Sequence, residues 1–179
     1  IRRWLDTGRQ PLPISVNVSR TYLQKEDVAG YIKNLIDKYQ IPMELFQLEI
    51  TETTENAESL SYINSLKQAG FTLLMDDFGS GYSSLCMLKN TPFDVLKMDR
   101  QFLDECLDSK QGKTIISHVI SMSNDLGLSI IAEGVENRGT ADFLYDNGCS
   151  VSQGFYFSKP VSIPEFEHML DEQQTEQQR

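Results

Sequence analysis

Short apolar runs alternate along the chain with segments of helical spacing, and this alternation constrains the fold more than any other feature. Six runs have the β-branched and apolar character of strands, and each precedes a stretch in which apolar residues recur every three or four positions. Such alternation is typical of repeated βαβ units that form one parallel sheet. The expected strands cover residues 14–19, 46–51, 72–78, 95–99, 129–136 and 151–157.

Helices are expected between these strands and at both ends of the chain. Residues 1–8 look like part of a helix, and Ser162 with Glu165 forms the capping box that starts the last helix. That helix is expected to end near Leu170, so we predict one domain over residues 1–170 and a polar tail over residues 171–179. The remaining helices are expected at residues 28–39, 60–69, 83–90, 113–126 and 140–147.

Polar residues interrupt the strands in a repeated way. Strands of a parallel sheet that is covered on both faces are normally apolar on both faces. A single polar residue there could be a satisfied structural group, but five strands that repeat it indicate a polar mouth at the C-terminal ends of barrel strands. These residues are Asn17, Glu49, Asp76, Lys97 and Glu133. We therefore predict an α/β fold, a TIM-like (β/α)8 barrel whose N-terminal strand or strands are missing from this chain.

Two adjacent acids, Asp76 and Asp77, end the third apolar run and precede a glycine-rich turn. In folds built on parallel strands, catalytic residues lie at the C-terminal ends of the strands. The two aspartates stand at such an end, so the pair is interpreted as an oxygen-ligand site for a hard divalent cation. The alternative is a turn acid that caps the following helix, because carboxylates are favoured at turns for local hydrogen-bonding reasons. The Asp-Asp pair alone does not decide between the two.

The composition excludes several classes of partner. A net charge of −10 argues against binding a nucleic-acid polymer, and an anionic substrate would need a metal to bridge the repulsion. The 3 cysteines are scattered and lack CxxC spacing, which favours reduced thiols and a cytoplasmic location. No apolar run approaches the length of a membrane span, so we expect no direct membrane contact in this segment.

Several motifs together resemble one known family. The motifs are, in this order, ISVNVS, LEITE, MDDFGSGYSSL, PFDVLKMD, IIAEGVE and QGFYFSKP, and the resemblance covers residues 14–170. The chain is similar to the EAL-domain phosphodiesterases, which hydrolyse the bacterial second messenger cyclic di-GMP. The resemblance implies a TIM-like barrel with one strand reversed, and metal-dependent hydrolysis of one phosphodiester to give the linear dinucleotide pGpG.

The resemblance also implies roles for individual residues. Lys97 would contact the attacking water or the phosphate, Glu133 would be the general base, and Glu52 would anchor the loop of residues 78–85. The first metal would be bound by Asn17, Glu49 and Asp76, and the second by Asp77. The residues that would line the site or hold its loop are Gly79, Ser80, Gly81, Asp99, Glu136 and Gln153.

Oxygen ligands suit Mg²⁺ or Mn²⁺ better than softer metals, so two such ions are expected as cofactors. Ca²⁺ prefers longer bonds and a looser shell and is expected to inhibit. The implied partners are cyclic di-GMP, a second copy of the chain in a homodimer, and an upstream sensory or diguanylate cyclase-like domain.

The motif that names the family, a Glu-Ala-Leu whose Glu is a metal ligand, does not occur in this chain. We therefore expect an N-terminally incomplete fragment that shows little hydrolysis alone. An alternative is a catalytically inactive EAL domain that acts as a cyclic di-GMP receptor or protein-interaction module. A different barrel enzyme, such as an enolase-like metal enzyme, would also gather acids and a lysine at strand ends, but the DFGSGYSSL and AEGVE segments argue against it.

Overall fold

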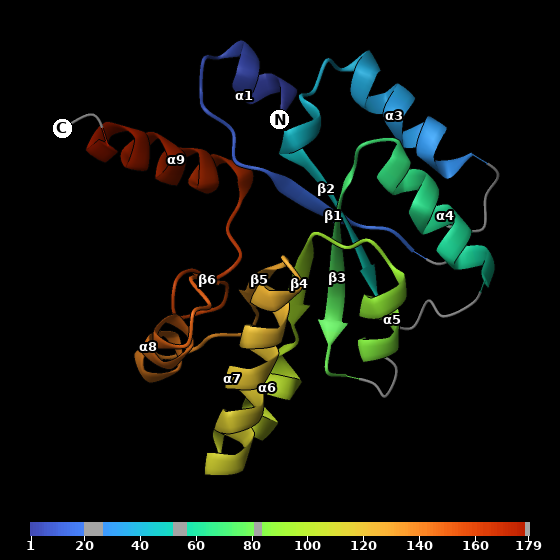
Figure 1. Ribbon diagram of the computed structural model, residues 1–179. Helices are drawn as coiled ribbons and strands as arrows, with labels where there is room; N and C mark the ends of the chain where they lie inside the picture. Colours follow the sequence, from blue (N-terminus) through green and yellow to red (C-terminus); the bar gives the residue numbers. More distant parts are fainter. Residues whose placement is uncertain (20–26, 52–56, 81–83, 178–179) are drawn as a thin grey trace.

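A single parallel sheet forms the centre of the molecule (Figure 1). The computed structural model describes residues 1–19, 27–51, 57–80 and 84–177. The six strands lie side by side in the order in which they occur in the sequence. They are β1 (Ile14–Asn17), β2 (Phe46–Thr51), β3 (Thr72–Phe78), β4 (Val95–Met98), β5 (Ser129–Ala132) and β6 (Val151–Ser152). The sheet curls into part of a barrel, as the alternating sequence pattern predicted.

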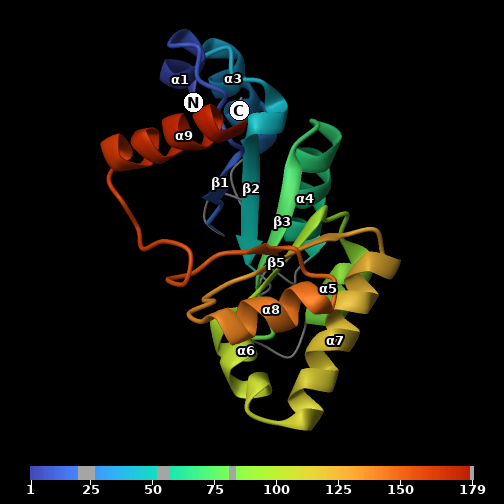
Figure 2. The same cartoon turned by 90° about the vertical axis from the view of Figure 1, so that its left-hand side faces the viewer.

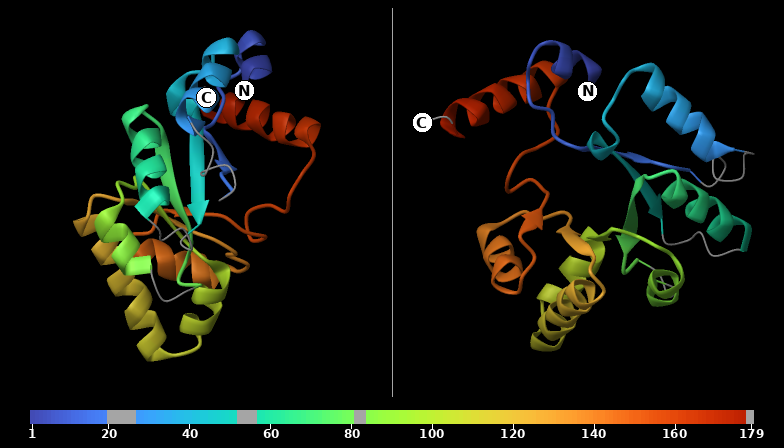
Figure 3. Two further views of the ribbon diagram at one scale, coloured as in Figure 1. Left: turned by 90° about the vertical axis from the view of Figure 1, so that its right-hand side faces the viewer. Right: turned by 45° about the horizontal axis from the view of Figure 1, so that its top comes forward.

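The helices lie around the outer side of this sheet (Figure 3). They are α1 (Arg2–Asp6), α3 (Val28–Lys38), α4 (Ala57–Gln68), α5 (Ser84–Asn90), α6 (Arg100–Leu107), α7 (Lys110–Asp125), α8 (Arg138–Asp146) and α9 (Ile163–Gln177), with a 3-10 turn η1 (Met43–Leu45) before β2. Every pairing between neighbouring strands is parallel, so a helix or loop crosses back before each new strand. Within the described ranges, no helix is both long and apolar enough to cross a membrane.

Alternate residues of the strands point toward the helices and form the core. In β2 the fully buried Leu48 and Ile50 flank Glu49, and in β4 the fully buried Leu96 and Met98 flank Lys97. Burial of each such apolar side chain contributes about 1.5–3 kcal/mol, which fixes the strand's orientation. Because successive side chains of a strand point to opposite faces, the polar residue between each pair must face the interior of the curved sheet.

Several predicted boundaries are wrong at the C-terminal half of the sheet. The fifth strand was expected to reach Glu136, but β5 ends at Ala132. The sixth was expected over 151–157, but β6 has two residues and the chain then turns, with Phe157 N donating to the Gly154 carbonyl (3.0 Å). Gly154 lies so close to Val135 that a Cβ would come within 2.3 Å of its backbone.

The last helix is longer than expected. Ser162 and Glu165 form the predicted capping box, with the Glu165 carboxylate accepting from the Ser162 backbone N–H (2.8 Å). The helix was expected to end near Leu170, but α9 continues to Gln177. Asp171 accepts two hydrogen bonds from Arg9 (2.7 and 3.0 Å), so a contact with the N-terminal segment supports the additional turns. Figure 2 shows α9 beside α1 at one end of the molecule.

One helix, α6, was not predicted at all. It begins immediately after β4, where the Asp99 carboxylate accepts a hydrogen bond from Gln101 N (2.8 Å). Asp at the N-cap satisfies one of the free N–H groups of the first turn, which favours a helix start. Asp99 is thus an N-cap residue that the sequence already contains, although the family resemblance assigns it to the site.

Candidate active site

Charged side chains from four neighbouring strands meet on the inner face of the sheet. Lys97 Nζ of β4 lies 2.9 Å from Glu49 Oε1 of β2 and 2.8 Å from Asp76 Oδ1 of β3. It also lies 2.7 Å from Oε1 of Glu133, which directly follows β5. The sequence predicts that five polar residues gather at one sheet edge, and the structure brings four of them together in direct contact, while Asn17, which the structure also describes, is not among the contacts of Lys97. We call Glu49, Asp76, Lys97 and Glu133 the Lys97 centre.

Burial makes the electrostatics of the Lys97 centre strong. Lys97 is 5% exposed, Asp76 7% and Glu49 8%. Burial alone would lower the pKa of Lys97, but hydrogen bonds to Asp76, Glu133 and Glu49 outweigh it and raise the pKa well above its ordinary value. With all groups ionised, three carboxylates surround one ammonium, so two negative charges remain in excess.

The surroundings of Glu133 shift the pKa of its carboxyl group. Burial raises the pKa of Glu133 above its ordinary value, and the negative charges of Asp76 and Glu49 act in the same direction. The hydrogen bond and charge of Lys97 oppose this rise but do not cancel it. A carboxylate whose pKa is shifted toward neutrality is suited to accept and return a proton.

The backbone is irregular where the two adjacent aspartates stand. The register between β3 and β4 shifts between Met75 and Phe78, and Asp77 adopts a left-handed conformation with φ of 60°. Such a bulge re-aims the neighbouring side chains. Asp76 faces Lys97, while Asp77 is only partly buried. Because Asp76 bonds to a lysine of another strand, its role is not that of a local helix cap.

The other predicted site residues occupy several places around the centre. Gln153 donates a hydrogen bond to Glu133 Oε1 and so joins the Lys97 centre. Asn17 is exposed at the end of β1, directly opposite Glu49 in the strand register. Glu136 pairs with Arg100 (2.7 Å) rather than with Lys97.

The remaining predicted residues lie in turns. Asp99 caps α6, and Gly79 and Ser80 form the turn that follows β3. Glu52 and Gly81 lie outside the described residues, as does part of the loop that Glu52 was expected to anchor. One contact was missed: Ser15 donates a hydrogen bond to Glu49 Oε1. Its position two residues before Asn17, on the same polar face of the strand, was the available signal.

The chemistry of the donors fits a hard divalent cation. Carboxylate oxygens are the ligands that Mg²⁺ and Mn²⁺ prefer, and the excess of two negative charges matches one such ion. Among the residues that the structure describes, no three His, Cys, Asp or Glu side chains are already arranged as a metal site. Glu49, Asp76 and Glu133 point their oxygens at the Lys97 ammonium instead.

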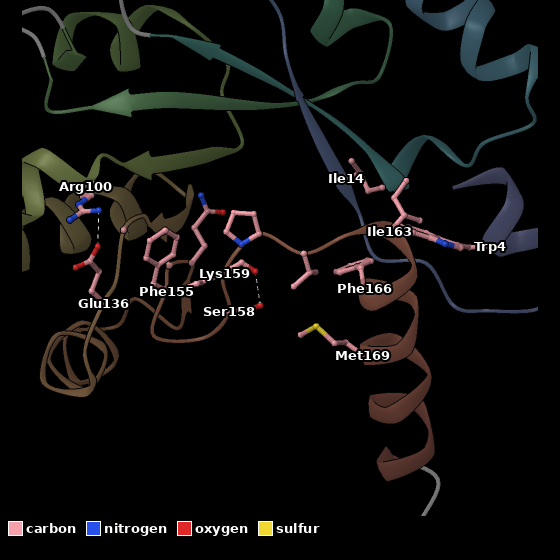
Figure 4. A pocket seen from close by; sticks show the side chains of 15 residues that line it. Trp4, Ile14, Arg100, Glu136, Phe155, Ser158, Lys159, Ile163, Phe166 and Met169 are labelled. Carbon is pink, nitrogen blue, oxygen red and sulfur yellow. Dashed lines mark hydrogen bonds and ion pairs between the residues drawn. The ribbon is translucent and has the colours of Figure 1, made fainter.

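A cleft of about 640 Å³ opens beside the Lys97 centre (Figure 4). It extends from the start of α6 past the segment after β6 to the inner side of α9. Aromatic and charged side chains line it, among them Trp4, Arg100, Glu136, Phe155 and Lys159. Gln153 also lines the cleft and bonds to Glu133, so the cleft and the Lys97 centre are adjacent. Its volume and mixed lining suit a nucleotide-sized ligand.

Comparison with known proteins gives a consistent result at both sequence and structure level. The family model described as the EAL domain matches residues 1–160. The cyclic di-GMP phosphodiesterase RocR of Pseudomonas aeruginosa is 36% identical over 173 residues, which are 95% of this chain and 43% of RocR. The chain spans less than half the length of RocR and of the other curated relatives compared with it.

Solved structures show the same architecture. The EAL domain of Mycobacterium smegmatis DcpA superposes with a TM-score of 0.87 and 31% identity, covering 96% of this chain and 78% of that chain. The complex of Klebsiella pneumoniae BlrP1 with manganese and cyclic di-GMP superposes with a TM-score of 0.78 and 28% identity, covering 89% of this chain and 41% of that chain. BlrP1 also forms a complex with calcium and cyclic di-GMP. With a family match over most of its length and a partial barrel of the same topology, the chain belongs to the EAL domain family.

Proposed function

We propose that this chain forms most of the catalytic domain of a phosphodiesterase that hydrolyses cyclic di-GMP to linear pGpG. The Lys97 centre supports this proposal most directly. A buried ammonium held by three carboxylates from neighbouring strands is costly to build, because each ion loses its hydration. A phosphodiesterase needs a positive charge, carboxylate metal ligands and a proton acceptor around one phosphate, and the Lys97 centre contains all three kinds of group.

Glu133 serves as the general base in this proposal. Its carboxylate takes a proton from a water whose oxygen adds to phosphorus, and one bridging P–O bond breaks. The leaving oxygen takes up one proton from solvent and Glu133 releases its proton to solvent, so one water is consumed and the product is the linear dinucleotide pGpG. The raised pKa of Glu133 supports this role, and Gln153 orients the carboxylate through its hydrogen bond. Lys97 supplies positive charge where negative charge develops on the phosphate.

Divalent cations would be held by Glu49 and Asp76 of the Lys97 centre together with Asn17, which registers with Glu49, and Asp77, which follows Asp76. We assign one Mg²⁺ or Mn²⁺ to Asn17, Glu49 and Asp76, and a second to Asp77. When bound, these ions neutralise the phosphate and make a neighbouring water more acidic. The manganese and calcium complexes of BlrP1 support divalent metal use in the family. Ca²⁺ is expected to occupy the same ligands with a looser shell and to inhibit.

The test is conversion of cyclic di-GMP to pGpG, followed chromatographically with Mn²⁺ and then with excess chelator. The polypeptide used is extended upstream through the Glu-Ala-Leu segment that other members of the family carry, and residues 1–179 are assayed in parallel. We expect turnover by the extended protein, its loss with chelator, and much slower turnover by residues 1–179. Full turnover in chelator would contradict the metal-dependent mechanism. Tight binding of cyclic di-GMP without any turnover would instead support a receptor.

A further inference from the structure

The first turn of α6 lies between the two turns that carry the acids of the site. One is the turn of residues 77–80 after β3, and the other is residues 133–136 after β5. Both are joined to the end of β4 by the backbone: Asp99 N donates to the Phe78 carbonyl (3.1 Å), and Glu133 N donates to the Met98 carbonyl (3.0 Å). Residues at the start of α6 therefore stand within reach of both turns.

Phe102 of α6 packs on the turn of residues 77–80. Gly79 has φ of 98°, and a Cβ built on it would lie 2.5 Å from Phe102 Cγ. The ring therefore occupies the space that any other residue at position 79 would need. Phe102 also meets Phe78 edge to face, with ring centroids 6.1 Å apart, and Phe78 is buried. These two contacts restrain the bulge that aims Asp76 and Asp77.

Arg100 of α6 packs in the same way on the turn of residues 133–136. Gly134 has φ of 67°, and a Cβ there would lie 2.4 Å from Arg100 Cγ. The stem of Arg100 covers the glycine, and its guanidinium forms an ion pair with Glu136 (2.7 Å, Figure 4). Gly134 directly follows Glu133, so the position of this turn sets the position of the Glu133 carboxylate.

The helix itself is a rigid platform. Asp99 caps its first turn, and Leu103 is almost fully buried against the core. Its C-terminal end is fixed by close packing on α7, where a Cβ on Gly112 would fall 2.0 Å from the Cys106 carbonyl oxygen. The backbone positions from which Phe102 and Arg100 extend are therefore held by a capped and packed helix.

We propose that Phe102 and Arg100 are positioning residues. Phe102 positions the turn of residues 77–80, and Arg100 positions the turn of residues 133–136. Neither touches the reacting atoms; each acts through one glycine and one neighbouring side chain. This inference rests on the proposed function for its chemical meaning. The structural claim is that one helix holds the two turns independently, and hydrogen exchange can test this claim without an activity assay.

The experiment compares Phe102→Ala and Arg100→Gln with Leu103→Ala in the upstream-extended protein. Hydrogen exchange is measured at the amides of residues 77–80 and 133–136, and Mn²⁺ affinity is measured by electron paramagnetic resonance without substrate. Phe102→Ala should speed exchange about tenfold in the first turn only and weaken Mn²⁺ binding by about 10–100-fold, as for other residues that orient metal ligands. Arg100→Gln should speed exchange in the second turn only and lower kcat more than it changes KM.

Leu103→Ala is the control for general destabilisation. It removes a buried side chain of the same helix that contacts neither turn glycine, so it should speed exchange in both turns together. Phe102→Tyr keeps the ring and should restore slow exchange and Mn²⁺ affinity. If Phe102→Ala behaved like Leu103→Ala, or changed neither turn, the positioning role would be refuted. Exchange effects confined to one turn in each variant, in an upstream-extended protein that hydrolyses no cyclic di-GMP, would retain this inference and refute the proposed function.

Discussion

Replacing Lys97 by Met tests whether the Lys97 centre is organised by its ammonium. Met has nearly the same length and is apolar, so the substitution removes the charge with little change in volume. Three carboxylates would then lie together without their common partner. Removing one partner of a buried ion pair typically costs about 3–5 kcal/mol, because the remaining charge is buried and unpaired.

For a chain of this size, that cost corresponds to a fall in Tm of roughly 6–20 °C. The matched control is Lys67→Met, since Lys67 pairs with Asp94 where both side chains are about one third exposed. Exposed pairs contribute about 0–1 kcal/mol, so this variant should melt within a few degrees of the parent. Both are measured by thermal and urea unfolding at pH 7 without metal.

Two further results would separate charge from packing. Combining Lys97→Met with Glu49→Gln, Asp76→Asn and Glu133→Gln should recover much of the lost stability, because the carboxylates then carry no charge. The single variant should also be stabilised by Mn²⁺ more than the parent, since its excess negative charge is larger by one. Equal melting of Lys97→Met and the parent would refute the view that the ammonium neutralises this cluster.

Three other outcomes are expected. In the upstream-extended protein, Glu133→Gln should retain cyclic di-GMP binding while kcat falls by about 10²-fold or more; a wild-type kcat would remove Glu133 as the base. The same protein should lose activity when Ca²⁺ replaces Mn²⁺ and regain it on exchange back; equal rates with both ions would contradict the assigned ligand set. Hydrogen bonds from Arg3 and Trp4 hold the pKa of Glu167 below its ordinary value of 4.5. The ionised Glu167 carboxylate therefore stabilises the fold above pH 4.5, and this stabilisation is lost as the pH falls through the pKa of Glu167 in the folded state. Fluorescence of the single tryptophan should report this acid transition, which should be absent in Glu167→Gln; an unchanged transition in that variant would assign it to another group.

The sequence predicted the site better than it predicted the ends of the elements. Glu49 and Lys97 each stand between apolar residues of a strand, so strand geometry alone places them on the inner face. The parallel order of strands then brings their ends to one edge. The spacing along the chain does not set distances between side chains, however. Only the structure shows that the three carboxylates point at the Lys97 ammonium. The sequence predicted carboxylates that bind a metal.

The boundaries that failed depend on contacts between distant parts of the chain. Just beyond the two residues of β6, Gly154 packs on the backbone of Val135, and no local pattern records that approach. Within the last helix, which continues to Gln177, Asp171 pairs with Arg9, which lies 162 positions away in the sequence. Propensity and capping rules describe neighbours in sequence, so tertiary contacts of this kind lie beyond them.

The order of the strands has a consequence for synthesis on the ribosome. Each strand pairs only with its neighbours in the sequence, so the sheet can grow in the direction of translation. Glu49 and Asp76 leave the ribosome before Lys97. Until β4 is made, the ammonium that compensates their negative charges is absent. Burial of β2 and β3 is therefore opposed in shorter nascent chains. The emergence of β4 supplies the ammonium that compensates the charges of Glu49 and Asp76 on the inner face of the growing sheet.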